Sequence, residues 1–430
     1  MSGATVLIMA AGEGTRMRSS LPKMLHPVCG RPMITWPVLA AREAGAERVC
    51  VIVSPDRDLS SALPEGTETV VQPESDGTGG AIRAALDIVR ASELVVVVNG
   101  DHPLITAELI ADAIDAHREA GAAATVVTVD RDDPTSLGRV VRDSSGDFER
   151  IVETKYPEGI PAEVLAIHEV NTNTFAFDAA ALGDAIERVS NDNAAGEYYI
   201  GDALRLIREQ GARVRVHKVE DVSVNIGVNT RAELAVASAV ARGRILERHM
   251  LAGVTVTDPE AAWVDADVEI EPDVTIHPFT VIRGDVTIAS GVEIGPFAFV
   301  RPGTSVGENA KIGAFVEVKK SSVGARTKIP HLSYIGDAEI GENTNIAAGN
   351  VTANFKHEAG QSKAKTRIGS NVRTGVDNTF DAPVEVGDDA WLAPGAVITD
   401  DVPPGSLAGF APRQVTKKGW VYEKHGNRDD

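Results

Sequence analysis

The sequence predicts two folds in one chain, an α/β domain followed by a parallel β-helix. The α/β domain is indicated by short apolar runs that alternate with helical patterns in the first half. The β-helix is indicated by an aliphatic residue that returns at every sixth position for most of the stretch from Val264 to Ile398. A six-residue period fits neither a helix nor one isolated strand, but it is typical of a solenoid with three short strands per coil. A series of hairpins would not keep so strict a register.

Composition limits the kinds of protein that this chain can be. Its 430 residues are enough for two or three domains, and a 43% hydrophobic content allows full cores. The net charge of −20 argues against nonspecific binding to nucleic acid. We see neither a signal-like start nor an apolar run as long as a membrane span. With only Cys29 and Cys50, we expect a cytoplasmic protein without structural disulfides or membrane insertion.

The α/β pattern places specific elements along the first half of the chain. We expect buried strands at Thr5 to Ala10, Val49 to Val53 and Leu94 to Val98, and helices at Ile34 to Ala44, Ala81 to Val89 and Ala107 to Ala120. A longer helix at residues 231–252 is expected to link a first domain, 1–230, to a second, 253–430.

The β-helix pattern is equally explicit. Its aliphatic positions are Val264, Ile270, Ile276, Ile282, Ile288, Ile294, Val300, Val306, Ile312 and Val318, then Val323, Ile329, Ile335, Ile340, Ile346, Ile368, Phe380, Val386, Leu392 and Ile398. Turn residues such as Gly307-Glu308-Asn309 are expected at the corners, since Gly, Asn and Asp tolerate positive φ. The polar segment from Thr352 to Lys365 interrupts the period and is expected to be a projecting loop.

A glycine-rich turn follows the first predicted strand. The stretch AAGEGTRMRSSLPK begins at Ala10 and ends at Lys23. Its backbone N–H groups could face phosphates, with Arg16 and Lys23 balancing the charge, although many βα turns contain glycines for steric reasons alone.

Two further polar sites follow predicted strands. Gln72 and Gly77-Thr78 precede a helix, where glycine would let a ligand approach the backbone, or where they simply form a helix entry. Asp101 directly follows the strand Leu94 to Val98. Ligands of open α/β sheets lie beyond the carboxyl ends of strands, so Asp101 could bind Mg²⁺, or it could be an ordinary turn aspartate.

Taken together, these stretches resemble a known family. The glycine-rich stretch resembles the signature of sugar-nucleotide pyrophosphorylases. The segments that contain Gly138, Glu153, Asn171, Asn193 to Tyr199 and Asn225 to Asn229 follow in the order typical of bacterial bifunctional N-acetylglucosamine-1-phosphate uridylyltransferases/glucosamine-1-phosphate N-acetyltransferases. The likeness covers nearly the whole chain. It implies a Rossmann-like α/β nucleotidyltransferase domain before a left-handed parallel β-helix of hexapeptide repeats.

The resemblance also implies roles for residues of the first domain. Lys23 and Arg16 would be catalytic and stabilise phosphate charge, and Asp101 with Asn229 would bind Mg²⁺. The other substrate-binding positions are Ala10, Ala11, Gly12, Gln72, Gly77 and Thr78 for UTP, and Gly138, Glu153, Asn171 and Asn229 for N-acetylglucosamine 1-phosphate.

In the β-helix, the resemblance implies a second site. His331 would be the general base for acetyl transfer. Glucosamine 1-phosphate would contact Arg301, Lys319, Tyr334, Asn345 and Lys363. Acetyl-CoA would contact Ala348, Asn354, Phe355, Val376 and Ala393, although Phe355 and Val376 stand where the family usually has Tyr and Ser.

The predicted function is therefore a bifunctional enzyme of UDP-N-acetylglucosamine synthesis, and so of cell-wall precursors. The expected partners are sugar phosphates, UTP and acetyl-CoA, with Mg²⁺ as cofactor and a homotrimer as assembly. Two alternatives remain open: a single-function pyrophosphorylase with a structural or regulatory β-helix, and a non-catalytic scaffold.

Overall fold

The computed structural model of this chain describes residues 3–154, 157–193, 195–355, 363–409 and 416–425. It divides into two compact units, residues 1–241 and 242–430. The division falls inside helix α8 (Arg231–Leu251), whose bounds agree with the helix expected near residues 231–252. Within the described part of the chain, no helix combines the length and apolarity that crossing a bilayer requires.

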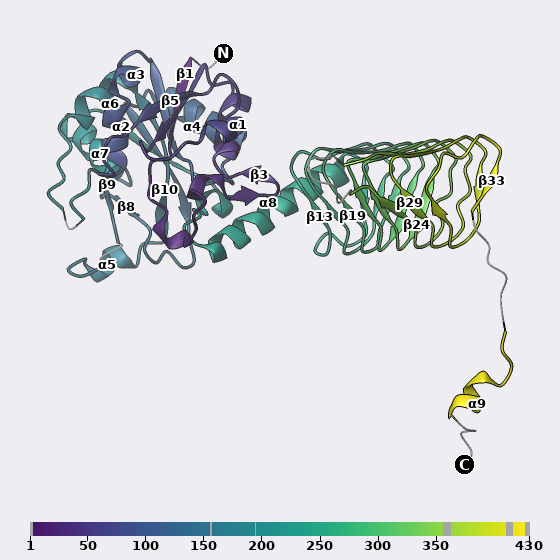
Figure 1. The fold of residues 1–430 in the computed structure, drawn as a ribbon. Helices are drawn as coiled ribbons and strands as arrows, with labels where there is room; N and C mark the ends of the chain where they lie inside the picture. Colours follow the sequence, from purple (N-terminus) through teal and green to yellow (C-terminus); the bar gives the residue numbers. More distant parts are fainter. Residues whose placement is uncertain (1–2, 155–156, 194, 356–362, 410–415, 426–430) are drawn as a thin grey trace. The chain divides into compact units, whose positions relative to one another are not determined.

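The first unit is built on a mixed β-sheet, seen with its helices in Figure 1. The order along its main path is β11-β7-β10-β6-β1-β4-β5, and β10 runs antiparallel to both of its neighbours. Its strands are β1 (Ala4–Met9), β4 (Arg48–Val53), β5 (Glu68–Val71), β6 (Leu94–Asn99), β7 (Ala124–Asp130), β8 (Arg139–Arg142), β9 (Phe148–Val152), β10 (Glu169–Asp178) and β11 (Val214–Lys218). A separate pair is formed by β2 (Pro27–Val28) and β3 (Arg31–Pro32).

Helices cover both faces of this sheet, because alternate side chains of its buried strands point to opposite sides. Leu7 and Met9 of β1 belong to one apolar core, and Val6 and Ile8 belong to the other. The helices are α1 (Thr35–Glu43), α2 (Thr78–Ala84), α3 (Leu86–Arg90), α4 (Ala107–Ala120), α5 (Ala162–Leu165), α6 (Ala179–Ile186) and α7 (Ile200–Glu209).

The expectation of one helix at Ala81 to Val89 is wrong. The structure begins this helix earlier, at Thr78, and interrupts it at Ala85. The Ala85 N–H donates to the Ile82 carbonyl three residues back at 3.0 Å, a tighter turn than an α-helix makes.

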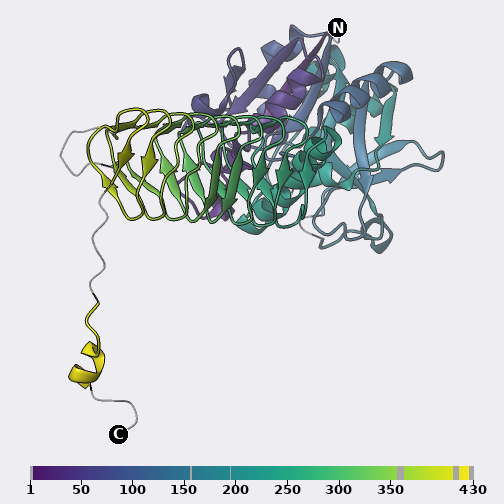
Figure 2. The same ribbon diagram turned by 90° about the vertical axis from the view of Figure 1, so that its right-hand side faces the viewer.

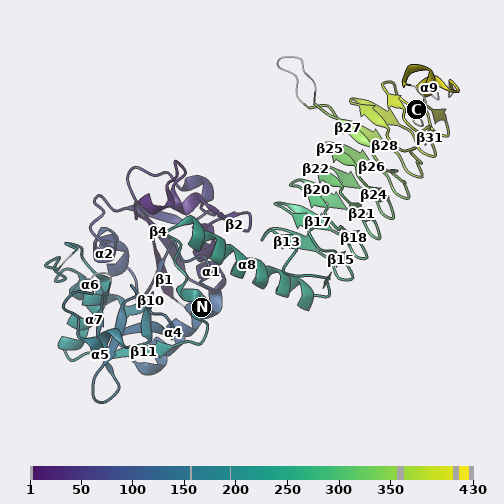
Figure 3. The ribbon, with the colours of Figure 1, turned by 90° about the horizontal axis from the view of Figure 1, so that it is seen from below.

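The second unit is a parallel β-helix with three faces (Figures 2 and 3). The first face contains β12 (Thr255–Val256), β15 (Thr275–Ile276), β18 (Glu293–Ile294), β21 (Lys311–Ala314) and β24 (Lys328–His331), and continues through Asn345 and Arg373 to β31 (Trp391–Leu392) and β33 (Leu407–Ala408). The second face contains β13 (Trp263–Val264), β16 (Val281–Ile282), β19 (Phe299–Val300), β22 (Glu317–Lys319), β25 (Tyr334–Gly336), β27 (Val351–Ala353), β29 (Thr379–Asp381) and β32 (Val397–Ile398). The third face contains β14 (Glu269–Ile270), β17 (Val286–Ile288), β20 (Thr304–Val306), β23 (Ser322–Val323), β26 (Ala338–Ile340), β28 (Thr366–Ile368) and β30 (Val384–Val386). A short helix, α9 (Trp420–His425), comes later in the chain.

The aliphatic residues that recur at every sixth position fill the interior of the β-helix. Ile276, Ile294 and Val318 are fully buried, and the other members of the repeat are also buried except for the half-buried Ile270. The period therefore marks the inward-facing position of most strands, as the sequence predicts, although β27 points Thr352 inward instead. Part of the loop expected at Thr352 to Lys365, residues 356–362, lies outside the described residues.

Candidate active sites

Parallel pairing brings the polar residues of the first domain to one edge of the sheet. β1 pairs in parallel with β6, and Met9 lies opposite Asn99. The segments that follow these strands, Ala10 to Gly12 and Asp101, therefore leave the sheet at the same edge. Gln72 reaches this edge as well, because it follows β5, which pairs in parallel with β4 beside β1.

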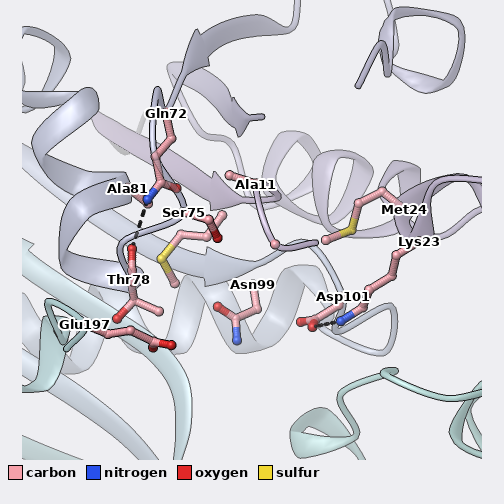
Figure 4. Close-up of a pocket in the computed structure, with 13 residues that line it drawn as sticks. Ala11, Lys23, Met24, Gln72, Ser75, Thr78, Ala81, Asn99, Asp101 and Glu197 are labelled. Carbon is pink, nitrogen blue, oxygen red and sulfur yellow. Dashed lines mark hydrogen bonds and ion pairs between the residues drawn. The ribbon is translucent and has the colours of Figure 1, made fainter. Parts of the chain in front are cut away.

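A cavity of about 270 Å³ lies at this edge, and Figure 4 shows its lining. Among the predicted residues, the lining includes Ala11, Gly12, Lys23, Gln72, Gly77, Thr78 and Asp101. It also includes residues that sequence reasoning did not select: Met9, Met24, Ser75, Ala81, Asn99 and Glu197. Asn99 could have been found from its place at the end of β6. Glu197 lies in the Asn193 to Tyr199 segment, which the resemblance highlighted without giving a role to each residue.

Lys23 is the central cation of this cavity. Its ammonium group donates to Asp101 Oδ2 at 2.5 Å and to Asn229 Oδ1 at 2.7 Å, and only 7% of its side chain is exposed. Gly14 makes this position possible, because a Cβ added there would lie 2.6 Å from Lys23 Cβ. The motif therefore uses a glycine to let the lysine stem pass close to the backbone.

The electrostatic surroundings keep Asp101 ionised. Burial by itself favours the neutral carboxyl, but the neighbouring His102 and Lys23 outweigh it and lower the pKa of Asp101. Burial also lowers the pKa of His102, so the Lys23 ammonium is the positive charge that faces Asp101 at neutral pH. His102 Nε2 lies 3.7 Å from the other oxygen of Asp101. The ionised carboxylate of Asp101 and the amide oxygen of Asn229 therefore both face the same position, which the Lys23 ammonium occupies.

The donor set at this point fits Mg²⁺. Carboxylate and amide oxygens are hard ligands, and Mg²⁺ is commonly held by one or two protein groups, with substrate phosphates and water completing its shell. The ammonium contacts both Asp101 and Asn229, which shows that the two oxygens converge on a position for a cation. Nowhere in the described residues, this position included, do three or more His, Cys, Asp or Glu side chains form a cluster suited to a metal, so the protein itself offers only these two ligands here.

The loop on the opposite side of the cavity is held by the segment around Tyr198. Gly77 adopts a φ of 104°, and a Cβ added to it would lie 2.6 Å from the Tyr198 carbonyl oxygen. The Gly79 N–H donates to that oxygen at 2.7 Å, and the Thr78 hydroxyl accepts from the Ile200 N–H at 3.0 Å. Gln72 is buried and donates to Asp76 Oδ1 at 2.7 Å. The predicted glycines are therefore required by close backbone packing.

The three residues expected to bind the acetylated sugar also lie together. Gly138 precedes β8, Glu153 follows β9, and Asn171 lies on β10, whose pairing with β7 shifts register just after it. The Asn171 N–H donates to the Gly138 carbonyl at 2.9 Å. A Cβ added to Gly138 would lie 3.2 Å from Glu153 Oε1.

Three of the residues predicted to bind nucleotide or metal do not line the cavity. Ala10 is 3% exposed and extends strand β1, donating its N–H to the Ile52 carbonyl at 2.9 Å. Arg16 lies in an exposed 3₁₀ turn, Thr15–Met17. Asn229, also absent from the lining, is connected to the cavity through its hydrogen bond to Lys23.

On the second face of the β-helix, polar side chains form what we call the Lys319 cluster. It consists of Lys319, Tyr334, Asp337, Asn354 and Lys363. Lys319 Nζ lies 3.6 Å from Asp337 Oδ2, and Asn354 hydrogen-bonds both Asp337 and, at 3.5 Å, the Tyr334 hydroxyl. The neighbouring Lys319 lowers the pKa of Lys363. The two neighbouring lysines, Lys319 and Lys363, carry more positive charge than the single carboxylate of Asp337 can balance. This excess of positive charge suits a dianionic phosphate.

A glycine is again what allows the cluster to form. A Cβ added to Gly336 would lie 2.4 Å from the Tyr334 hydroxyl and 2.8 Å from Asn354 Nδ2. Arg301 occupies the position equivalent to that of Lys319 in the preceding coil. Its N–H donates to the Val318 carbonyl at 2.8 Å. Its guanidinium pairs with Glu317 at 2.7 Å.

The predicted base, His331, lies at the end of β24, at the corner between the first and second faces. It is exposed and pairs with Ala314 of the preceding coil. Ala348 and Val376 take the equivalent position in the following coils, because each lies two residues before an asparagine whose carbonyl accepts from the second-face strand of the preceding coil. They therefore follow His331 in a row, with a spacing of about 4.8 Å per coil.

Of the remaining predicted residues of the β-helix, Asn345 lies apart from this corner, whereas Ala393 is next to the row. Asn345 pairs with Lys328, three positions before His331 along the first face, so it is about 10 Å from the corner along the strand direction. Ala393 precedes Pro394 in the coil after Val376, and Phe355 is 64% exposed. One chain thus contains both the Lys319 cluster and the corner row, but it leaves Asn345 outside both.

Comparison with known proteins identifies a different domain family in each half of the chain. Residues 6–199 match the MobA-like NTP transferase domain, and residues 267–302 match the bacterial transferase hexapeptide repeats. Curated relatives named bifunctional protein GlmU align over almost the entire chain. That of Corynebacterium glutamicum is 40% identical over 98% of this chain and 94% of its own length. That of Kineococcus radiotolerans is 42% identical, with 98% and 92% covered, and that of Caldanaerobacter subterraneus is 39% identical, with 97% of each covered.

These matches confirm the predicted fold class, a Rossmann-like nucleotidyltransferase domain followed by a left-handed β-helix of hexapeptide repeats. They also confirm the prediction of a bifunctional enzyme whose domains fit uridylyl and acetyl transfer. The roles of individual residues stay predictions. With about 40% identity across 98% of its length, the chain belongs to the family of bifunctional GlmU proteins.

Proposed function

We propose that the first domain joins UTP to N-acetylglucosamine 1-phosphate, and that the second domain makes this acceptor by acetylating glucosamine 1-phosphate with acetyl-CoA. The observation that supports the first reaction most directly is the convergence of Lys23, Asp101 and Asn229 beside a cavity with a glycine-rich wall. The second reaction is supported by the Lys319 cluster near His331.

In the first reaction, a phosphate oxygen of the sugar attacks the α-phosphorus of UTP. The bond from this phosphorus to the bridging oxygen of the β-phosphate breaks, and pyrophosphate leaves. Gly12, where an added Cβ would meet nothing within 4 Å, lets the nucleotide lie close to the backbone, and Lys23 supplies positive charge to the phosphates. Gly138, Glu153 and Asn171 hold the sugar on the side formed by β8, β9 and β10.

Bound Mg²⁺ would be held by Asp101 and Asn229 and would neutralise the charge of the phosphates. Because the Lys23 ammonium contacts both oxygens in the ligand-free site, Lys23 has to leave them when the metal binds. It is then free to turn toward the phosphates. Arg16, which is exposed and outside the cavity lining, contributes only if its turn moves toward bound nucleotide.

In the second reaction, the 2-amino group of glucosamine 1-phosphate attacks the thioester carbon of acetyl-CoA. The C–S bond breaks, coenzyme A leaves as the thiol, and His331 accepts the proton lost by the amine. The Lys319 cluster and Arg301 bind the sugar phosphate. Ala348 and Val376 lie in the row above His331, where the small side chain of Ala348 leaves space for the extended arm of the donor.

The protein acts in the cytoplasm as a homotrimer in this proposal. The separation of Asn345 from the corner of His331 supports an assembly, because a neighbouring chain could bring its own Asn345 to this corner. A cyclic trimer of parallel β-helices would place three equivalent sites at three junctions.

Two assays on purified protein test the proposal. Pyrophosphate release is measured with UTP, Mg²⁺ and N-acetylglucosamine 1-phosphate, and free thiol is measured with acetyl-CoA and glucosamine 1-phosphate. Asp101→Ala should abolish the first activity and leave the second nearly unchanged, since Asp101 belongs to the first domain. Equal loss of both activities would contradict two independent sites, and absence of thiol release from the unaltered protein would favour a structural β-helix.

A further inference from the structure

Three polar side chains point into the β-helix directly behind the corner of His331. They are Ser333, Asn350 and Asn378, and we call them the internal ladder. Each is at most 3% exposed. They occupy the same position in successive coils, because the carbonyl of each accepts an N–H from the second-face strand of the preceding coil. The Ser333 hydroxyl donates to the His331 carbonyl at 2.8 Å and also lies 3.3 Å from the carbonyl of Ala347 in the next coil.

The two asparagines of the internal ladder connect the corner carbonyls of neighbouring coils. Asn350 Nδ2 donates to the Ala347 carbonyl of its own coil at 2.7 Å and to the Gly375 carbonyl of the next coil at 3.0 Å. Asn378 Nδ2 donates to the Ala393 carbonyl, again in the next coil, at 2.7 Å. The corner that carries the proposed acyl-donor contacts is therefore held from inside the β-helix.

The position of the internal ladder does not require a polar side chain. Ala298 and Val316 occupy it in the two coils before the ladder, and Ala396 occupies it in the coil after. The asparagines also carry a cost, because Oδ1 of Asn350 and of Asn378 is buried without a hydrogen-bond partner among the described residues. An amide whose oxygen stays unpaired contributes to this corner through its Nδ2 group alone.

The internal ladder determines which backbone groups the corner presents to solvent. The C=O and N–H groups of a trans peptide unit point in opposite directions. Because Asn350 binds the Ala347 and Gly375 carbonyls from inside, the N–H groups that follow them, those of Ala348 and Val376, point outward. Neither of these N–H groups has a hydrogen-bond partner within the described part of the chain. Two donors on neighbouring coils, about 4.8 Å apart, thus face solvent in the row that begins at His331.

We propose that Asn350 and Asn378 are positioning residues for the acyl donor, and that neither touches it. Asn350 holds the corner backbone so that the N–H groups of Ala348 and Val376 can donate to the amide carbonyl oxygens in the extended arm of coenzyme A. Asn378 fixes Ala393, another predicted contact of the donor, through its carbonyl. The side chains of alanine and valine form no hydrogen bonds, so the backbone is the polar group that these positions offer. This inference rests on the proposed acetyl transfer.

The test separates positioning from a purely structural role of the same hydrogen bonds. Asn350→Val removes the amide but places a side chain that this position already accepts at Val316. Thr327→Val is the matched control, because the buried Thr327 hydroxyl donates to the Gly341 carbonyl of the next coil at 2.6 Å, at a different corner. Both variants lose one interior polar group, and urea titrations followed by circular dichroism establish that they fold.

We expect Asn350→Val to act on the acyl donor alone. The KM for acetyl-CoA, and the Kd for coenzyme A measured by calorimetry without sugar phosphate, should each rise about tenfold, since misplaced N–H groups lose one or two hydrogen bonds. The KM for glucosamine 1-phosphate and the rate of pyrophosphate release should stay unchanged. Asn350→Ser keeps a donor like that of Ser333 and should limit the rise to about threefold. Thr327→Val should leave all four quantities unchanged.

The inference is wrong if folded Asn350→Val keeps the KM for acetyl-CoA and the Kd for coenzyme A of the unaltered protein, or if the KM values of both substrates rise equally. Should Asn350→Val not fold, Asn378→Ala decides, because alanine already fits this position at Ala396. That variant should raise the Kd for coenzyme A about threefold, and an unchanged Kd would overturn the inference.

The unaltered protein distinguishes this failure from failure of the proposed function. If it neither binds coenzyme A nor releases thiol from acetyl-CoA, the proposed acetyl transfer is wrong and the inference falls with it. If it does both while the asparagine variants behave like the control, only the positioning role is removed and the acetyl transfer stands.

Discussion

The contact of Lys23 with both proposed metal ligands leads to an unexpected prediction for Lys23→Met. This substitution keeps the length and apolar stem of the side chain but removes the ammonium group that holds Asp101 Oδ2 at 2.5 Å and Asn229 Oδ1 at 2.7 Å. Because Mg²⁺ has to displace this group in our proposal, its removal should strengthen the binding of Mg²⁺ alone. Catalysis should weaken at the same time, because the phosphates lose a cation.

The magnitude follows from the contacts that Mg²⁺ no longer has to break. A hydrogen bond to a charged group contributes about 1.5–3 kcal/mol. At about 1.4 kcal/mol per tenfold change, the Kd for Mg²⁺ should fall roughly 10- to 150-fold. The pair is mostly buried, with 7% and 19% of the two side chains exposed, so solvent screening reduces this value little.

Isothermal titration calorimetry with MgCl₂ in the absence of nucleotide, at pH 8, measures this affinity. The pH matters because Lys23→Met also removes one cause of the low pKa of Asp101, and the carboxylate must stay ionised. Asp101→Asn is the matched control and should show weaker Mg²⁺ binding than the unaltered protein. An unchanged or larger Kd in Lys23→Met would refute the idea that the ammonium group and the metal compete for the same oxygens.

Three further predictions concern single side chains. His331→Ala should lower thiol release by roughly two to four orders of magnitude while pyrophosphate release persists, and full thiol release would mean that the base is elsewhere. Gly138→Ala should raise the KM for N-acetylglucosamine 1-phosphate roughly tenfold, because the added Cβ would lie 3.0 Å from Ile151 Cγ2 and 3.2 Å from Glu153 Oε1 and would displace both side chains. An unchanged KM in kinetics with varied sugar phosphate would show that these side chains do not contact the sugar. Burial raises the pKa of Glu169, but hydrogen bonds from Arg142 and Thr128 outweigh this and lower it below its usual 4.5. The stabilisation from Glu169 should thus be present above pH 4.5 and disappear as pH falls through the lower folded value, so urea titrations should show a smaller acid-induced loss of stability in Glu169→Gln.

Some features of this chain are determined by local sequence. The six-residue period identifies the buried positions of the β-helix because a strand in each face always points the same residue inward, as at Ile276 and Ile294. The apolar run before Asp101 identifies a buried strand, and chain direction then places Asp101 at the edge where ligands bind. Both conclusions need only the geometry of a strand and its immediate turn.

Other features are decided by contacts between distant segments, which no local pattern contains. Lys23 meets Asn229 across 206 positions, and Tyr198 covers Gly77 and Gly79 because separate loops leave the same edge of the sheet. In the β-helix, the corner conformation of Phe297 depends on how each coil closes, so the sequence shows a Pro-Phe pair where the structure shows a strained, exposed ring stacked on two others. The sequence thus determined which residues are buried and which turns are tight. The tertiary structure alone decided which polar groups meet and which apolar side chains stay exposed, because those outcomes depend on how separate strands and coils pack in space.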